Sequence, residues 1–260
     1  MSLDHASKIV KHQTLTRDAF LGGKLTVTQP RHGFRAGLDS VLLGAAVRDD
    51  AATLLDLGAG VGTAALVALA DRPGLSATLV ESDADTAALA EQNLATNGLA
   101  DRGSVIRLDV TAPGRQREGA GLPADHFDAV IANPPYFEAG KGTPAVTARL
   151  AARQFAPESI EAWVKTAATH AAPGGEAVFI FPAQSLHELL AAFHLRFGGI
   201  AILPFTPHAG EAATRVLVRG IKGSRAPLTL LASRALHEEG SRAFRAEFEA
   251  IFRGAGRLDW

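Results

Sequence analysis

The spacing of hydrophobic and polar positions predicts strands that alternate with helices from residue 53 onward. Short runs rich in aliphatic and β-branched residues are the expected strands, at Thr53–Leu57, Ala77–Glu81, Val105–Leu108, Phe127–Ala132 and Ala177–Phe181. Helical patterns lie between them, at about 63–71, from Asp83 to Gly98, and from about Glu158 to Ala171. This alternation is typical of βαβ units and a parallel sheet.

The strand runs are nearly continuous in apolar residues, as expected for strands covered by helices on both faces. Further strands are expected near Ile200–Phe205, Thr214–Val218 and Leu228–Leu231, and a final helix near Ser241–Phe252. The Gly-, Pro- and charge-rich stretch Thr111–Ala124 is expected to be an exposed loop. Because no domain boundary is visible, we predict one α/β domain over residues 1–260, with a doubly wound, mostly parallel, Rossmann-like sheet.

Composition narrows the classes of protein without identifying one. Hydrophobic residues make up 47% and charged residues 20% of the chain, which is typical of soluble globular proteins. The absence of cysteine excludes disulfides, thiolate metal sites and a cysteine nucleophile. No apolar run approaches the ~20 residues of a membrane-spanning helix, and the N-terminus has no signal-peptide pattern. We therefore expect a cytoplasmic protein without a membrane partner.

Charge is distributed unevenly along the chain. The net charge is −1, but residues 1–140 hold 12 Lys or Arg against 17 Asp or Glu, whereas residues 141–235 hold 10 against five. A basic stretch of this kind is expected of a surface that faces a polyanion, and it is equally consistent with an ordinary solvated surface.

A glycine-rich turn follows the first expected strand, in the run Asp56-Leu57-Gly58-Ala59-Gly60-Val61-Gly62. Glycines allow a tight turn and a close approach of the backbone to a ligand, and they place amide groups at the start of the next helix. Such a turn suits NAD(P), FAD or S-adenosylmethionine (SAM), or a simple strand-to-helix connection.

Acidic residues stand at the ends of the next two expected strands. Glu81 lies 19 residues beyond Gly62 and is placed to accept hydrogen bonds from both hydroxyls of a ribose. Asp109 ends the third strand and is placed to accept from an adenine amino group. A glycine turn followed by these two acids indicates SAM, because an NAD enzyme would need only the first two features.

The fourth expected strand is followed by Asn133-Pro134-Pro135-Tyr136. The two prolines fix the backbone and leave carbonyl groups pointing outward. The Asn133 side-chain oxygen and the Pro134 carbonyl are then able to hold one NH₂ group, while the Tyr136 ring stacks on a planar system. Two acceptors on the NH₂ hydrogens favour electron density on a nitrogen that is otherwise a poor nucleophile, so positioning and electrostatics supply most of the rate.

These residues resemble those of class I SAM-dependent methyltransferases with an Asn-Pro-Pro-Tyr motif, and most closely the bacterial tRNA(Val) adenine-N6 methyltransferase family. The resemblance runs over nearly the whole chain. It implies SAM as cofactor and a seven-stranded sheet with an antiparallel last pair. It also implies methylation of an adenine in RNA, with tRNA as the expected partner. In that family a stretch matching Gly33–Gly44 lies over the cofactor, with Thr usual where this chain has Leu38.

The resemblance assigns roles to named residues. Residues 1–50 are implied to be an N-terminal segment that covers the cofactor site. Arg215–Gly223 matches a late strand and basic loop of one branch of the family. The expected catalytic residues are Asn133, Pro134, Pro135 and Tyr136. The expected cofactor-binding residues are Asp39, Asp56, Gly58, Ala59, Gly60, Glu81, Asp109 and Asn133. The expected RNA contacts are Arg35, Arg149, Arg153, Arg215, Lys222 and Arg225.

Three other functions fit part of this pattern. A glutamine side-chain amide in a protein fits the same pair of acceptors, although enzymes of that kind usually carry a separate N-terminal helical domain. A non-catalytic RNA-binding subunit is expected to have lost the glycine turn or the Asn-Pro-Pro-Tyr run, and both are intact here. A small-molecule O-methyltransferase usually needs a metal or a base. The nine histidines show no metal-ligand spacing, so no metal is expected, and only His32 and His208 are placed to border a site.

Overall fold

The computed structural model describes residues 14–32, 35–135 and 157–260. Its strands are β1 (Leu15–Phe20), β2 (Leu25–Pro30), β3 (Thr53–Leu57), β4 (Ser76–Glu81), β5 (Gly103–Arg107), β6 (Phe127–Ala132), β7 (Ala171–Pro182), β8 (Phe197–Thr206), β9 (Arg215–Lys222), β10 (Thr229–Leu230) and β11 (Arg234–Ala235). Its helices are the short η1 (Leu21–Gly23) and η2 (Ala183–Ser185), with α1 (Leu38–Ala45), α2 (Thr63–Asp71), α3 (Ala84–Thr96), α4 (Gly114–Gly119), α6 (Pro157–His170), α7 (Leu186–His194) and α8 (Ala246–Phe252).

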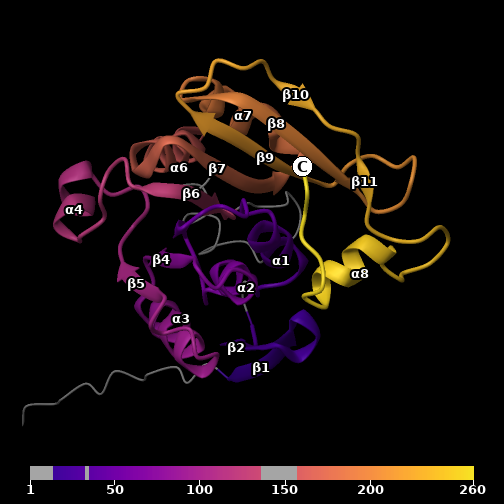
Figure 1. Ribbon diagram of the computed structural model, residues 1–260, viewed down its shortest axis with the longest axis horizontal. Coiled ribbons are helices and arrows are strands. Elements are labelled where there is room, and N and C mark those ends of the chain that lie inside the picture. Colours follow the sequence, from indigo (N-terminus) through magenta and orange to yellow (C-terminus); the bar gives the residue numbers. More distant parts are fainter. Residues whose placement is uncertain (1–13, 33–34, 136–156) are drawn as a thin grey trace, which may run out of the picture.

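The central sheet has the order β10-β8-β9-β7-β6-β3-β4-β5, and β11 also pairs with β8 (Figure 1). Strands β5, β4, β3, β6 and β7 run parallel to one another, whereas β9 is antiparallel to both of its neighbours, β7 and β8. These seven strands match the seven-stranded sheet that the resemblance implies. The strand expected near Leu228–Leu231 is the two-residue β10, and β10 and β11 extend the sheet to nine strands. The predicted α/β class and mostly parallel, Rossmann-like sheet are confirmed.

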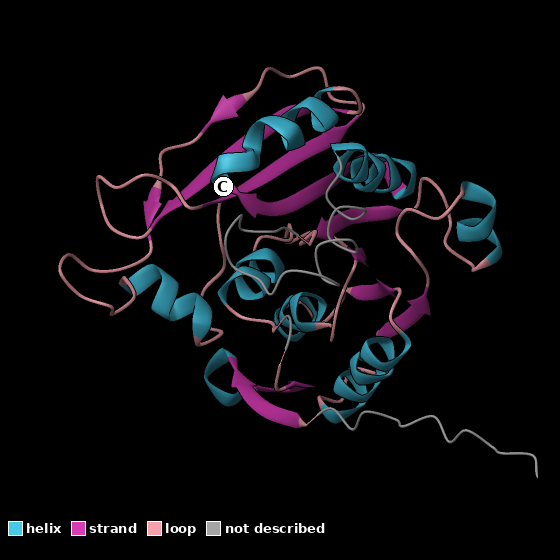
Figure 2. Cartoon of the chain, turned by 180° about the vertical axis from the view of Figure 1, so that it is seen from behind, coloured by secondary structure: helices cyan, strands magenta, loops and turns pink. Residues whose placement is uncertain are grey.

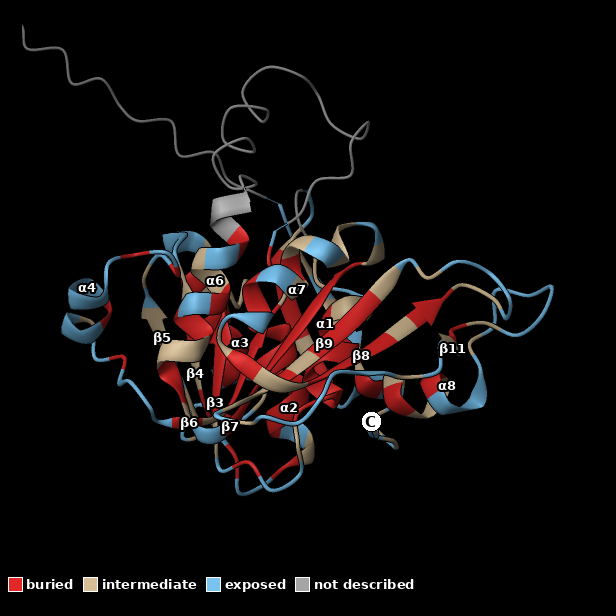
Figure 3. Ribbon diagram, turned by 90° about the horizontal axis from the view of Figure 1, so that it is seen from above, coloured by how far each residue is buried: buried red, intermediate tan, exposed pale blue. Residues whose placement is uncertain are grey.

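Helices cover both faces of the sheet, with α1 and α2 on one face and α6 and α7 on the other (Figures 1 and 3). Successive strand residues point to opposite faces, so one strand contributes to two cores. In β3, Leu54 packs in the core with α1 and α2, whereas Leu55 and Leu57 pack in the core with α6 and α7. This double burial explains the continuous apolar runs in the sequence.

Helix α3 begins and ends at the predicted signals. Asp83 is its N-cap, with Oδ1 accepting from the Thr86 N–H at 2.9 Å. Beyond its C-cap Asn97, Gly98 has a φ of +67°, a conformation that favours glycine. The Asp83 N–H donates to Glu81 Oε1 at 2.9 Å, which ties the start of the helix to the end of β4.

The N-terminal hairpin of β1 and β2 was not predicted. Its strands pair antiparallel from Leu15↔Pro30 to Phe20↔Leu25, and β2 lies alongside α3 (Figure 2). In β1 every second residue is exposed and the others are only partly buried, because most of this strand lies outside the core. Its tight connection, η1, places Leu21 and Gly22 at positive φ.

Two other expectations need correction. The stretch Thr111–Ala124 is not a simple exposed loop, because it contains α4 and buries Arg117, whose guanidinium donates to the Ala112 carbonyl at 2.7 Å. Strand β7 begins at Ala171, six residues before its predicted start. Gly174, at a φ of +77°, lies in an irregularity after which pairing with β6 resumes at Glu176.

Within the described ranges, no helix is long and apolar enough to cross a membrane.

Candidate functional site

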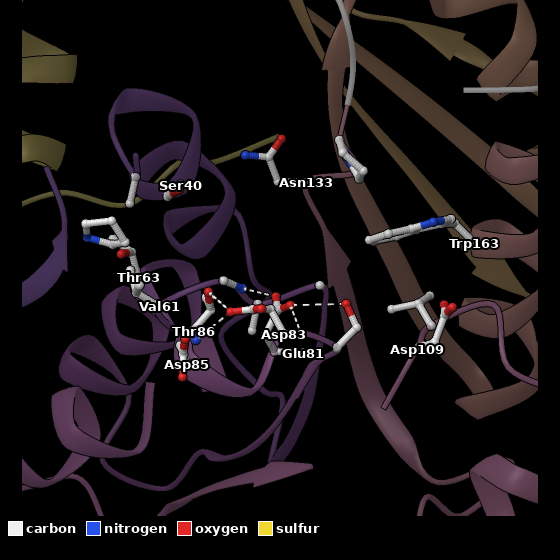
Figure 4. A pocket seen from close by; sticks show the side chains of 18 of the residues that line it. Ser40, Val61, Thr63, Glu81, Asp83, Asp85, Thr86, Asp109, Asn133 and Trp163 are labelled. Atoms are coloured by element: carbon white, nitrogen blue, oxygen red, sulfur yellow. Dashed lines mark hydrogen bonds between the residues drawn. The ribbon is translucent and has the colours of Figure 1, made fainter. Parts of the chain in front are cut away.

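A pocket of about 690 Å³ lies at the carboxyl ends of β3, β4, β5 and β6 (Figure 4). Each of these strands contributes residues at or just after its last position, and the N-terminal segment and α6 complete the wall. Parallel strands place their carboxyl ends at one edge of the sheet, which is where ligands bind in open α/β folds. The structure therefore brings together Gly58, Ala59, Gly60, Glu81, Asp109, Asn133 and Pro135.

The turn after β3 depends on glycine at each of its three glycine positions. Gly58, Gly60 and Gly62 have φ values of +65°, +57° and +86°, which side chains with a Cβ rarely adopt. A Cβ at position 58 would also collide with the Trp163 ring, whereas position 60 faces open space. The bare backbone of this turn forms one wall of the pocket.

Asp56 lies beneath this turn and is not among the residues that line the pocket. Its side chain is 2% exposed, and Oδ2 accepts from the Ala65 N–H at 3.2 Å in the first turn of α2. Burial raises the pKa of Asp56 to about 7, and the nearby charge of Glu81 acts in the same direction. Asp56 therefore supports the turn from below in this structure.

Glu81 holds the glycine turn and the start of α3 together. Its Oε2 accepts from the Gly60 N–H at 3.0 Å, and its Oε1 accepts from the Asp83 N–H at 2.9 Å. The Ser82 hydroxyl also donates to Oε1, at 3.3 Å. A carboxylate has about four acceptor sites, so one site of Glu81 remains for a ligand hydroxyl, and rotation of the Ser82 hydroxyl would release a second.

Asp109 forms a local turn at the end of β5. Its Oδ1 accepts from both the backbone N–H and the hydroxyl of Thr111, each at 2.8 Å. No hydrogen bond to Oδ2 occurs within the described part of the chain, so this oxygen is the acceptor that remains for a ligand amino group.

Asn133 follows β6 directly and lines the pocket. Its Oδ1 is buried and has no hydrogen-bond partner among the described residues. A buried acceptor without a partner costs roughly 1–3 kcal/mol, so such an atom in a pocket wall points to a ligand that satisfies it. Pro134 is buried behind it, and Pro135 is exposed at the rim. The predicted Tyr136 lies outside the described residues.

Several lining residues were not predicted from the sequence. Trp163 reaches in from α6, and Figure 4 shows its ring between Asn133 and Asp109. Thr63, at the start of α2, has a second buried oxygen without a partner in the described ranges. Pro30 and Ser40 come from the N-terminal segment, as does His32, which the sequence marked as a border residue. Trp163 and Thr63 lie in patterns that predict only amphipathic or buried helix.

Asp39 and Arg215 contact each other. Asp39 is the second residue of α1, and its Oδ2 lies 3.0 Å from Nε of Arg215, the first residue of β9. Asp39 is not among the residues that line the pocket, although its neighbour Ser40 is. The structure thus joins a predicted cofactor residue to a predicted RNA contact.

The other predicted RNA contacts are dispersed. The Arg35 guanidinium bonds Asp18 at 2.7 Å and the Pro30 carbonyl at 2.9 Å, which ties it to the hairpin. Lys222 lies at the opposite edge of the sheet, where its ammonium donates to Asp125 and to the Ala168 and Ala171 carbonyls. Arg225 follows Lys222 at that edge, while Arg149 and Arg153 fall outside the described residues.

The lining residues suit SAM. Four carboxylates, Glu81, Asp83, Asp85 and Asp109, line the pocket, and the described lining includes neither Lys nor Arg. This balance favours a ligand with cationic sulfonium and ammonium groups over one with a pyrophosphate. The two unpartnered oxygens, of Thr63 and Asn133, add acceptors that such a ligand or its reaction partner would satisfy. Among the described residues no group of three or more acidic or histidine side chains is arranged to bind a metal ion.

Comparison with known proteins identifies the family of the chain. The model of the methyltransferase small domain matches residues 38–185. A tRNA1(Val) (adenine(37)-N6)-methyltransferase of Shewanella baltica is 35% identical over 190 residues, which cover 71% of this chain and 76% of that protein. The enzyme of the same description from Citrobacter koseri is 31% identical over 80% of this chain and 89% of its own length.

A solved structure is also similar. The Agrobacterium tumefaciens protein Atu636, described as a predicted O-methyltransferase, is 36% identical with a TM-score of 0.72, over 85% of this chain and 98% of that one. A tRNA (m1A58) methyltransferase of Aquifex aeolicus shares the fold, at 16% identity and a TM-score of 0.52 over 75% of this chain and 72% of that one. The chain belongs to the methyltransferase small domain family and is a SAM-dependent methyltransferase.

Proposed function

We propose that the protein methylates the exocyclic nitrogen of an adenine in tRNA. The observation that carries the proposal is the buried, unpartnered Oδ1 of Asn133 in the wall of the pocket. It is supported by the names of the Shewanella and Citrobacter relatives, which methylate adenine 37 of tRNA1(Val) at N6 according to those names. A tRNA substrate places the proposed reaction in the cytoplasm.

The proposed chemistry assigns a role to each side of the pocket. Bound SAM supplies an electrophilic methyl group on a positively charged sulfur. Asn133 Oδ1 accepts a hydrogen bond from the adenine NH₂, and the Pro134 carbonyl accepts the second. The carboxylates of Glu81 and Asp109 hold the ribose and adenine of the cofactor. In this arrangement the protein orients the nitrogen and stabilises the positive charge that develops on it. The N–CH₃ bond would form as the S–CH₃ bond breaks, leaving a neutral thioether, and the surplus proton of the nitrogen would pass to water without a dedicated base.

The N-terminal segment completes the proposed site. Pro30, His32, Ala36 and Ser40 line the pocket, which supports the proposal that residues 1–50 cover the cofactor within one domain of residues 1–260. Asp39 acts in this proposal through its ion pair with Arg215, at the edge of the sheet that carries Asn133.

Oxygen methylation, the activity predicted for Atu636, is the alternative that the experiment must separate. The described pocket lining has one histidine, His32, and no lysine that would deprotonate a hydroxyl. An NH₂ group has two hydrogens for the two acceptors, Asn133 Oδ1 and the Pro134 carbonyl, whereas a hydroxyl has one, and this favours nitrogen over oxygen as the methyl acceptor.

The test is methyl transfer from labelled SAM to unmodified tRNA, followed by nucleoside digestion and mass spectrometry. N6-methyladenosine that is absent with Asn133→Ala is the expected result. A 2′-O-methylated nucleoside of the same mass, separated by its retention and fragments, would overturn the proposed atom. Transfer to a glutamine-containing protein but not to tRNA would overturn the proposed substrate.

A further inference from the structure

Asn93 connects the N-terminal hairpin to the glycine turn of the pocket. It lies on α3 with no exposed surface. Its Oδ1 accepts from the Thr28 N–H at 2.8 Å, and its Nδ2 donates to the Thr28 carbonyl at 2.9 Å. The second Nδ2 hydrogen donates to the Val61 carbonyl at 3.0 Å. One side chain therefore bonds two segments that are 33 residues apart in the sequence.

Asn97, the C-cap of α3 one turn after Asn93, makes the same pair of hydrogen bonds to β2. Its Oδ1 accepts from the Thr26 N–H and its Nδ2 donates to the Thr26 carbonyl, both at 2.9 Å. Its remaining hydrogen donates to the Asn93 carbonyl at 2.7 Å, within the same helix. Four helical residues rise about 6 Å, and two strand residues rise about 6.6 Å. The spacing of Asn93 and Asn97 along the helix therefore matches the spacing of Thr28 and Thr26 along β2, and each asparagine bonds one of these residues.

The hydrogen bond from Asn93 to the Val61 carbonyl constrains the glycine turn after β3. The Val61 carbonyl and the Gly62 N–H belong to one planar peptide, so fixing the carbonyl fixes the direction of the N–H. That N–H donates to the Ala59 carbonyl at 2.9 Å and closes the turn. Within the closed turn, Gly60 donates to Glu81.

The hydrogen bonds from Asn93 and Asn97 to β2 position the opposite wall of the pocket. Strand β2 ends at Pro30, which lines the pocket. Buried Gln29 extends the connection, since its Oε1 accepts from the Ala36 N–H at 2.9 Å. The position of Pro30 and Ala36 in the wall therefore depends on where α3 holds β2.

We propose that Asn93 is a positioning residue that couples docking of the β1–β2 hairpin to the geometry of the SAM site, so that cofactor affinity depends on the docked hairpin. The inference rests on the proposed function only in taking SAM as the ligand of this pocket. Asn97 fixes the hairpin without touching the turn, and it provides the matched comparison.

The experiment compares Asn93→Asp with Asn97→Asp by calorimetric binding of S-adenosylhomocysteine. Each carboxylate keeps the acceptor for β2 and loses both donors, so each loses one bond to a β2 carbonyl. Only the first variant also loses the bond to Val61. We expect Asn93→Asp to weaken binding about tenfold and Asn97→Asp by less than about twofold, each measured equally far below its own melting temperature. In assays of transfer, the KM for SAM rises in Asn93→Asp while kcat and the KM for RNA stay unchanged. Equal weakening by the two variants, or loss of kcat alone, overturns the proposal.

Hydrogen exchange of the unaltered protein gives a test that no folding defect affects. S-adenosylhomocysteine is expected to slow exchange of the Thr26 and Thr28 amides by at least about fivefold, although neither residue lines the pocket. The Leu231 amide, which bonds Ile202 at the far edge, is the control. Unchanged rates at Thr26 and Thr28 contradict the coupling. Failure to bind S-adenosylhomocysteine at all would overturn the SAM site, whereas binding without tRNA methylation would overturn only the proposed substrate.

Discussion

The two ends of strand β6 carry polar side chains in opposite situations. Near its start, Asp128 Oδ2 accepts from the Ala52 N–H, the Thr53 N–H and the Thr53 hydroxyl, at 2.9 to 3.0 Å. Directly after its end, Asn133 Oδ1 is buried without a partner among the described residues. The fold supplies hydrogen-bond donors to the Asp128 carboxylate. It supplies none from the described residues to Asn133 Oδ1, which leaves that oxygen to a ligand. Within one strand, Asp128 anchors the fold, whereas Asn133 is the residue proposed to take part in the reaction.

The largest effect is expected from Asn133→Ala. Loss of the acceptor for the amino group should lower kcat about 100- to 1000-fold, by analogy with removing one stabilising group from a reaction site. Stability should not fall, because the lost oxygen has no partner in the described fold. Single-turnover transfer and urea unfolding measure the two effects. If Asn133→Ala retained activity, or lost stability instead, Asn133 would not differ in role from Asp128 at the other end of β6.

Asp128→Ala is the matched change at the other end of the strand. It should lower the free energy of unfolding by about 2 kcal/mol through lost hydrogen bonds to a carboxylate, and leave kcat unchanged. Burial alone would raise the pKa of Asp128, but the hydrogen bonds from Ala52 and Thr53 outweigh it and the pKa is lowered. A lowered folded-state pKa gives stability that is present above the unfolded value of ~3.9 and lost as the pH falls further. Urea unfolding at pH 7 and pH 3 should therefore show less acid destabilisation in the variant than in the unaltered protein.

The strand-end chemistry was accessible from the sequence because it follows from two local rules. Apolar runs mark strands buried on both faces, and parallel strands place their carboxyl ends together. Glu81, Asp109 and Asn133 each come directly after such a run, or end it, and all three line the same pocket. No side-chain contact had to be known for this prediction.

Residues whose roles depend on tertiary partners were harder to predict. Lys222 is seven residues from Arg215, and in a strand that spacing separates them by about 23 Å. Strand β9 runs against its neighbours, so Arg215 lies at the edge with Asn133 and Lys222 at the edge with Asp125. Within the described residues, the basic stretch of the sequence therefore does not form one surface. The hairpin was missed for a similar reason, since its exposed strand β1 lacks a core-facing pattern.

Ligand binding by variants of Trp163 and Trp260 tests whether the ligand lies at the Asn133 end of β6. Trp163 lines the pocket, whereas Trp260 stacks on Arg219, with 4.7 Å between the guanidinium carbon and the ring centre, and donates to the Ala46 carbonyl. Trp163→Ala should weaken S-adenosylhomocysteine binding about fivefold or more through lost stacking on a base. The tryptophan fluorescence change on binding should persist in Trp260→Phe and vanish in Trp163→Phe. A signal that follows Trp260 instead would place the ligand elsewhere.

The smallest effect is expected from removing one charge at a time, at Arg31 in one variant and at Lys222 in another. This pair of variants tests which edge of the sheet contacts RNA. Arg31 is exposed between two residues that line the pocket, Pro30 and His32. Arg31→Gln should weaken tRNA binding about threefold and reduce the slope of log affinity against log salt by about one. Lys222→Gln should leave both unchanged and lower only the melting temperature, because its ammonium is held by Asp125 and two carbonyls. Filter binding at several salt concentrations measures both. If Lys222→Gln alone changed the slope, the RNA would lie along the amino edge of the sheet, and Asn133 would be too distant to act on it.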